Sequence, residues 1–239
     1  MATLILVRHG RTTANAGGML AGRLPGVRLD DTGEEQVRRL GERLSSVPLT
    51  AIVSSPQERC RQTAKAIAAA QPIRLRVATD RGLSECDYGD WQGRPLKELA
   101  KEALWKTVQA QPSAASFPGG ESMVAMQSRA VLAVRRHDAA VEAEHGSGAV
   151  WAAMSHGDVI KSILADALGM HLDLFQRIHV DPASVSIISY SSTRPYVLAS
   201  NTHDGDLSWL APKPGRKRRS PRKRADAAVG GGAGPSAPA

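Results

Sequence analysis

Apolar runs alternate with amphipathic segments along most of the chain. Residues 3–8 (TLILVR) are almost entirely aliphatic, and residues 49–55 (LTAIVSS) and 150–154 (VWAAM) are further short apolar runs. Runs of this length are typical of strands that are buried on both faces of a sheet. Two more segments, 184–190 and 194–200, surround a polar turn and predict a closing pair of strands.

Helical periodicity fills the intervals between these runs. The segment DDTGEEQVRRLGERLSSV places Val37, Leu40 and Leu44 on one face, and Thr32 and Glu35 have the spacing of a capping box. This segment therefore predicts an amphipathic helix that begins at Thr32.

Two further helices are expected on similar grounds. Residues 56–70 open with Pro56, which is favoured in the first turn of a helix, and then repeat small apolar residues every three or four positions. A longer amphipathic segment follows the turn motif PGGES, with Glu121 or Ser122 at the helix start, and runs to about Glu144.

This alternation of strand and helix predicts an α/β fold. The expected arrangement has three layers, α/β/α, with a mostly parallel central sheet and helices on both faces. A chain of 239 residues with 42% hydrophobic residues is long enough for one such domain, which we assign to residues 1–211.

Residues 212–239 differ from the rest of the chain in composition. They contain eight Lys and Arg residues against Asp226 alone, so seven of the eight units of net positive charge lie there. Charge repulsion, Pro, Gly and the scarcity of large apolar side chains predict a disordered tail. Its basic cluster is compatible with weak, nonspecific contact to a polyanion, and equally with a solvated tail that has no partner.

The remaining composition favours a soluble, cytoplasmic protein. No apolar run reaches the roughly 18 residues of a membrane span, and the N-terminal segment lacks the cationic lead of a signal peptide. Cys60 and Cys86 are too few for a disulfide framework and lack metal-ligand spacing, so both are expected as reduced thiols. No heptad pattern indicates an oligomeric state.

Three predicted strands end in groups that suit phosphate. Arg8 and His9 follow the first strand, the second leads directly to Arg59, and His156 and Gly157 follow the strand VWAAM. Ligands gather at the carboxyl ends of strands in such sheets, so these groups are expected to converge. Arginine forks match phosphate oxygens, and the helices that start after these turns direct backbone N–H groups to the same place. An RHG and an SHG at two strand ends together predict an anion site.

Five motifs occur in a fixed order: LVRHGRTTAN, SSPQERCRQTA, LSECDYGDWQG, PGGES and SHGDVIKSIL. In order and spacing they resemble the motifs of the histidine phosphatase superfamily, also called phosphoglycerate-mutase-like. The resemblance covers about residues 3–200. It implies a three-layer α/β/α fold and a covalent phosphohistidine intermediate.

The resemblance also implies roles for individual residues. His9 is the expected nucleophile and Glu85 the expected proton donor, with Asp87 and Asp90 as nearby competitors for the latter role. The expected phosphate-binding set comprises Arg8, Asn15, Gly22, Arg59, His156 and Gly157. No cofactor or metal ion is expected, because the arginines supply the charge that a metal would bring.

Elementary chemistry agrees with these roles. A neutral imidazole is a competent nucleophile near pH 7, and attack of His9 on phosphorus would divide the hydrolysis into two easier displacements. Arg8, Arg59 and a protonated His156 are expected to stabilise charge on the phosphoryl oxygens. Glu85, kept protonated in a partly desolvated pocket, would protonate the leaving alkoxide and then activate water.

The predicted function is hydrolysis of a small-molecule phosphomonoester, and three alternatives stay open. A mutase would transfer the phosphoryl group between hydroxyls, although DYGDWQG resembles the phosphatase branch and the longer arginine-bearing insertion of mutases is missing. An inactive phosphate sensor or a tail-mediated nucleic-acid-binding module is disfavoured, because the chain retains every side chain that the proposed catalysis requires. A metallohydrolase built on His9, Glu85, His156 and Asp158 fits less well, since arginines beside His9 would repel a cation.

Overall fold

The computed structural model describes residues 2–203, 205, 207 and 210. Its strands are β1 (Thr3–Arg8), β2 (Ala51–Ser54), β3 (Val77–Thr79), β4 (Val150–Ser155), β5 (Val185–Tyr190) and β6 (Pro195–Thr202). Its α-helices are α1 (Thr13–Ala16), α2 (Asp31–Leu44), α3 (Glu58–Ala70), α4 (Leu96–Leu99), α5 (Ala103–Ala110), α6 (Met123–His145) and α7 (Gly157–Ala167). Short 3₁₀ helices are η1 (Arg81–Leu83), η2 (Gly89–Trp91), η3 (Pro112–Ala114) and η4 (Leu172–Arg177). The predicted basic tail, 212–239, lies outside the described residues.

The strands form one sheet in the order β3-β2-β4-β1-β5-β6. Strands β1, β2, β3 and β4 are parallel to one another, whereas β5 is antiparallel to both β1 and β6. The predicted mostly parallel sheet is therefore confirmed. The register pairs Arg8 with Ser155, so the residues that follow β1 and β4 leave the sheet side by side.

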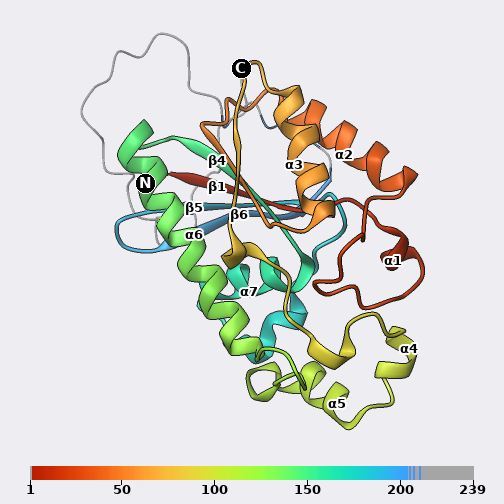
Figure 1. Cartoon of the computed structure of the whole chain (residues 1–239). Coiled ribbons are helices and arrows are strands. Elements are labelled where there is room, and N and C mark those ends of the chain that lie inside the picture. The colour runs from red at the N-terminus through yellow and green to blue at the C-terminus, as the bar shows by residue number, and fades with distance from the viewer. Residues whose placement is uncertain (1, 204, 206, 208–209, 211–239) are drawn as a thin grey trace.

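Helices cover both faces of this sheet, as Figure 1 shows with α2 and α3 on one side and α6 on the other. Side chains of β1 alternate between the two layers. Leu4 and Leu6 join the core beneath α6 and α7, while Ile5 and Val7 join the core beneath α2 and α3. All four are fully buried, which explains why this strand reads as a continuous aliphatic run.

The N-cap of helix α2 lies two residues before the position that the capping-box spacing predicts. Asp30 is its N-cap, and the Asp30 carboxylate accepts the Gly33 N–H at 2.8 Å. The expected cap at Thr32 is wrong, and the Thr32 hydroxyl instead accepts a hydrogen bond from Arg11. Asp30 is fixed by the loop after β1, because its N–H donates to the Arg11 carbonyl and its carboxylate pairs with the Arg11 guanidinium.

Of the other two predicted helix starts, the one for α3 is wrong and the one for α6 is confirmed. Pro56 lies outside α3, because Gln57 is the N-cap of this helix and its first residue is Glu58. Helix α6 starts as expected: Ser122 is its N-cap and its side chain accepts the Ala125 N–H.

Candidate active site

The ends of β1, β2 and β4 bring two histidines and two arginines together. His9 follows β1, His156 follows β4, and their ring centroids are 5.2 Å apart in an edge-on arrangement. Arg59 lies in the first turn of α3, just after β2. His9, Arg59 and His156 are all buried, so their polar groups must find partners in the protein or in a ligand.

His9 is held as a neutral imidazole. Its Nδ1 lies 2.8 Å from the carbonyl oxygen of Gly10, so Nδ1 carries the proton and donates it. Its Nε2 then has a lone pair, which accepts a hydrogen bond from Nε of Arg59 at 3.2 Å. Burial, followed by the charges of Arg59 and Arg8, holds the pKa of His9 well below its usual value.

Arg59 connects both histidines to the loop before α2. Its Nη2 donates to the carbonyl oxygen of Gly22 at 2.8 Å and to Nδ1 of His156 at 3.1 Å. Gly22 adopts a φ of +52°, and a Cβ at this position would lie 2.5 Å from the Gln92 side chain. The loop therefore requires glycine where its carbonyl meets Arg59.

The hydrogen bonds of His156 favour a neutral ring in this structure, and its protonation beside phosphoryl oxygens stays a prediction. Because Nδ1 accepts from Arg59, the ring proton is on Nε2, which lies 3.1 Å from the amide oxygen of Gln57 and 2.7 Å from Oγ of Ser55. Burial, followed by the charge of Arg59, lowers the pKa of His156 well below its usual value. Sequence reasoning missed Gln57, whose contact depends on the turn before α3.

Arg8 and Arg59 each retain a buried nitrogen that has no hydrogen-bond partner among the described residues. These atoms are Nε of Arg8 and Nη1 of Arg59. Nη1 of Arg8 donates to the carbonyl oxygen of Val180, which fixes the guanidinium beside the start of α7. A Cβ on Gly157, the first residue of α7, would lie 3.6 Å from that guanidinium. Unpartnered N–H groups beside a helix N-terminus form a place prepared for an anion.

Asn15 has a local role in the structure. Its side-chain oxygen accepts from the N–H of Thr12 at 3.1 Å and from the Thr12 hydroxyl at 2.9 Å. These bonds close the capping box of α1, and the residue is exposed. Contact of Asn15 with phosphate stays a prediction.

Glu85 is the acidic side chain that lies against the histidines. Its Oε2 is 3.8 Å from Nδ1 of His156, and its Oε1 accepts the N–H of Cys86 at 3.0 Å. Burial, and then the charge of Asp158, raises the pKa of Glu85 to about 7. Its sequence neighbour Asp87 instead pairs with Arg23.

Two arginines hold the backbone of Glu85, and sequence reasoning identified neither of them. Nε of Arg23 and Nη2 of Arg129 donate to the Glu85 carbonyl oxygen at 2.9 and 3.0 Å. Both guanidinium groups also bind the carboxylate of Glu121, which comes from the PGGES motif. The contacts join segments far apart in sequence, so Arg23 and Arg129 carry no local signal.

Asp158 is likewise engaged by protein groups. It accepts the phenolic O–H of Tyr88 at 2.8 Å and lies 3.7 Å from Nζ of Lys161. Over the described part of the chain, no group of three or more His, Cys, Asp or Glu side chains is arranged to hold a metal ion. The metal alternative also places a cation where Arg59 donates to both imidazoles.

Two other sequence expectations concern the remainder of the molecule. Cys60 and Cys86 are both buried free thiols. Among the residues placed in the structure, no helix combines the length and the apolar composition that crossing a bilayer requires.

Comparison with known proteins identifies the family. The sequence profile of the histidine phosphatase superfamily (branch 1) matches residues 4–203. The chain belongs to the histidine phosphatase superfamily. The resemblance found in its five motifs is thereby confirmed.

Relatives of this histidine phosphatase carry both mutase and phosphatase names. This chain is 34% identical over 166 residues to phosphoglycerate mutase-like protein 4 of Arabidopsis thaliana, and the match covers 68% of this chain and 69% of the relative. It is 31% identical over 204 residues to phosphoserine phosphatase 1 of Hydrogenobacter thermophilus, covering 84% and 92%. The solved alpha-ribazole phosphatase of Shigella flexneri superposes with a TM-score of 0.72 at 25% identity, covering 84% of this chain and 96% of that one. The three-layer α/β/α fold is therefore that of the family.

Proposed function

We propose that this histidine phosphatase hydrolyses small-molecule phosphomonoesters through a phosphohistidine on Nε2 of His9, without a metal ion. The observation that carries the proposal is the state of His9, whose Nδ1–H donates to Gly10 and whose Nε2 presents a lone pair. That lone pair lies in a site where Arg8 and Arg59 have buried N–H groups without partners among the described residues. A phosphoryl group supplies what both features require, an electrophilic phosphorus and anionic oxygens.

The proposed reaction consists of two displacements. Nε2 of His9 forms a bond to phosphorus while the bond from phosphorus to the leaving oxygen breaks, and Glu85 transfers its proton to that oxygen. The Glu85 carboxylate then takes a proton from water as the water oxygen attacks phosphorus and the N–P bond breaks. A carboxyl group with a pKa of about 7 is suited to both proton transfers near neutral pH.

The cations around the site favour a hydrolase over a mutase. A mutase needs fixed positive charge to retain the remainder of its substrate after transfer. Arg23 is already paired with Asp87, Arg94 is paired with Glu102 at 2.7 Å, and Lys97 is exposed. Because these two arginines are already in ion pairs and the lysine faces solvent, the arrangement supports release of the alcohol product rather than its retention.

The decisive experiment measures phosphate release from 4-nitrophenyl phosphate and a metabolite panel in the presence of EDTA. The wild type should turn over, His9→Ala should not, and the matched control His171→Ala, at an exposed histidine, should retain wild-type activity. Radiolabelled phosphate should be trapped by alkaline quench on the wild type and on His171→Ala, but not on His9→Ala. Label on His9→Ala, or loss of activity with EDTA, would overturn the mechanism. Interconversion of phosphoglycerate isomers without phosphate release would favour the mutase.

A further inference from the structure

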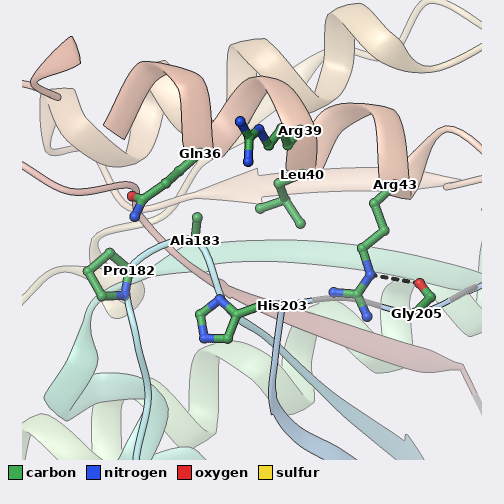
Figure 2. A pocket seen from close by; sticks show the side chains of 8 residues that line it. All are labelled: Gln36, Arg39, Leu40, Arg43, Pro182, Ala183, His203 and Gly205. Carbon is green, nitrogen blue, oxygen red and sulfur yellow. Dashed lines mark hydrogen bonds between the residues drawn. The ribbon is translucent and has the colours of Figure 1, made fainter. Parts of the chain in front are cut away.

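A cavity of about 350 Å³ lies between α2 and the turn that precedes β5. Figure 2 shows α2 on one side of it and the segment around Pro182 and His203 on the other. We call this cavity the α2 pocket. Gln36, Arg39 and Arg43 line it from α2. Pro182, Ala183 and His203 line the opposite wall.

Among the residues that the structure describes, the lining of the α2 pocket has two guanidinium groups and no carboxylate. Arg39 also bonds Glu35, and Arg43 donates to the carbonyl oxygens of Thr202 and Gly205. His203 lies 3.2 Å from Asp181, a carboxylate whose pKa is lowered to about 2, first by a hydrogen bond from Asn201. Within the described part of the chain, Glu35 and Asp181 are thus already paired, and the lining itself contributes two guanidinium groups.

Apolar groups complete the walls of the α2 pocket. Leu40 contributes from α2, and Pro182 and Ala183 contribute from the opposite turn. The amide oxygen of Gln36 accepts the Arg11 N–H at 2.9 Å, so its NH₂ group is the part that a ligand would meet. A volume of about 350 Å³ is sufficient for a small organic molecule.

Both walls of the α2 pocket are hydrogen-bonded to the catalytic segment. The N–H of Ala183 lies 3.1 Å from the carbonyl oxygens of both Arg8 and His9. From the other wall, Gln36 holds the N–H of Arg11. Ala183 has a φ of 58°, in the left-handed region that non-glycine residues rarely adopt. A ligand that shifts either wall therefore acts directly on the backbone that positions His9.

We propose that the α2 pocket binds an organic anion with a flat apolar body, and that its occupancy is communicated to His9 through Gln36 and Ala183. The anionic group would meet Arg39 and the amide of Gln36, and the apolar body would pack on Leu40 and Pro182. The communication rests on the proposed function, whereas binding does not. Coupling between two sites is reciprocal, so a phosphate analogue at His9 changes the affinity of the α2 pocket by the same factor.

Binding is tested by titration calorimetry with 1-naphthalenesulfonate, an organic anion that cannot be hydrolysed as a phosphomonoester. The wild type and His9→Ala should bind it with similar affinity. Arg39→Glu should weaken binding at least tenfold, and Arg39→Ala less. The matched control is Arg38→Glu, which also removes a partner of Glu35 but lies outside the cavity lining, and it should change affinity less than twofold.

Two results would overturn binding at this site. One is equal affinity, or no binding, in both the wild type and Arg39→Glu. The other is an affinity that falls without limit as orthovanadate is added, since that would place the probe in the catalytic site.

Communication is tested by the hydrolysis of 4-nitrophenyl phosphate with and without the probe. At saturating probe, kcat or KM of the wild type should change at least twofold, with a midpoint that matches the calorimetric Kd. Arg39→Glu should keep the basal rate and lose this response. Unchanged kinetics at saturation would overturn the communication. If the wild type has no turnover at all, the proposed function fails, and the calorimetry still decides binding.

Discussion

Replacing Glu85 by glutamine should make the folded protein more stable at pH 8 while removing its proton donor. The Glu85 side chain is 12% exposed, and burial, followed by the charge of Asp158, raises its pKa from 4.5 to about 7. Glutamine keeps an oxygen that can accept the Cys86 N–H but carries no charge. The substitution therefore separates the cost of burying the charge from the packing of the side chain.

The size and sign of the effect follow from this change in pKa. The gap between 4.5 and about 7 corresponds to about 3 kcal/mol of unfolding free energy. Because the folded-state pKa is the higher one, the wild type loses this stability as the pH rises from about 4.5 to about 7. The loss is complete at pH 8 and less than about 1 kcal/mol at pH 5. The gain from Glu85→Gln should follow the same window.

Urea unfolding at pH 5 and pH 8 measures the difference, and Glu121→Gln is the matched control with the opposite sign. Burial alone would raise the pKa of Glu121, but hydrogen bonds from Arg129 and from the Asp87 N–H outweigh it and lower the pKa. Glu121→Gln should therefore lose stability to a similar degree at pH 5 and pH 8, and should lose less only as the pH falls below 4.5. Hydrolysis of alkyl phosphates by Glu85→Gln should fall about 10²- to 10⁴-fold. A Glu85→Gln protein that is destabilised at pH 8, or shifted equally at both pH values, would refute the reasoning.

Four further outcomes are expected. The acid side of the kcat/KM profile should decline below pH 6.5, because burial and the neighbouring arginines lower the pKa of His9 and keep it neutral; a half-loss at or above pH 6.5 contradicts this. Arg59→Lys should reduce kcat/KM about 10²- to 10³-fold, since an ammonium cannot bond His9 and the Gly22 carbonyl in the same geometry, and steady-state kinetics with unchanged circular dichroism would show it. Gly22→Ala should cost about 1–3 kcal/mol in urea unfolding, because its φ is positive and the new Cβ would lie 2.5 Å from Gln92; an unchanged midpoint would exclude this strain. Cys60 should react with an aromatic disulfide at pH 8 only in urea, since burial raises its pKa to about 12, and rapid labelling of the native protein would contradict that environment.

The parts of the fold that depend on local pattern could be predicted from the sequence. The mainly aliphatic run 3–8 coincides with β1 residue for residue, because this strand is buried on both faces and residues 4–7 are all apolar. The meeting of His9 and His156 follows from two parallel neighbouring strands that end at the same edge. In both cases the signal lies within a few consecutive residues.

The features that the sequence did not reveal depend on contacts between distant segments. The start of α2 was misplaced because Asp30 is held by Arg11 from the loop after β1, and this contact has no counterpart in the capping pattern. Arg129 reaches the Glu85 carbonyl from the second turn of α6, and nothing in the sequence around it indicates that contact. The hydrogen bonds of the His156 ring also depend on a distant segment, since Arg59 lies at Nδ1, and Ser55 and Gln57 lie at Nε2.

Burial shifts the pKa values of Glu85 and His9 in opposite directions, and this difference supports their separate proposed roles. It raises the pKa of Glu85 and lowers the pKa of His9, so that near neutral pH a proton donor and an unprotonated nucleophile coexist. The arginines strengthen the second effect through their positive charge, and their unpartnered N–H groups are costly without an anion. In the proposed reaction a phosphoryl group would satisfy these donors, so part of its binding energy would offset an instability already present in the folded protein. The same features that destabilise the empty site therefore favour the charged ligand on which it is proposed to act.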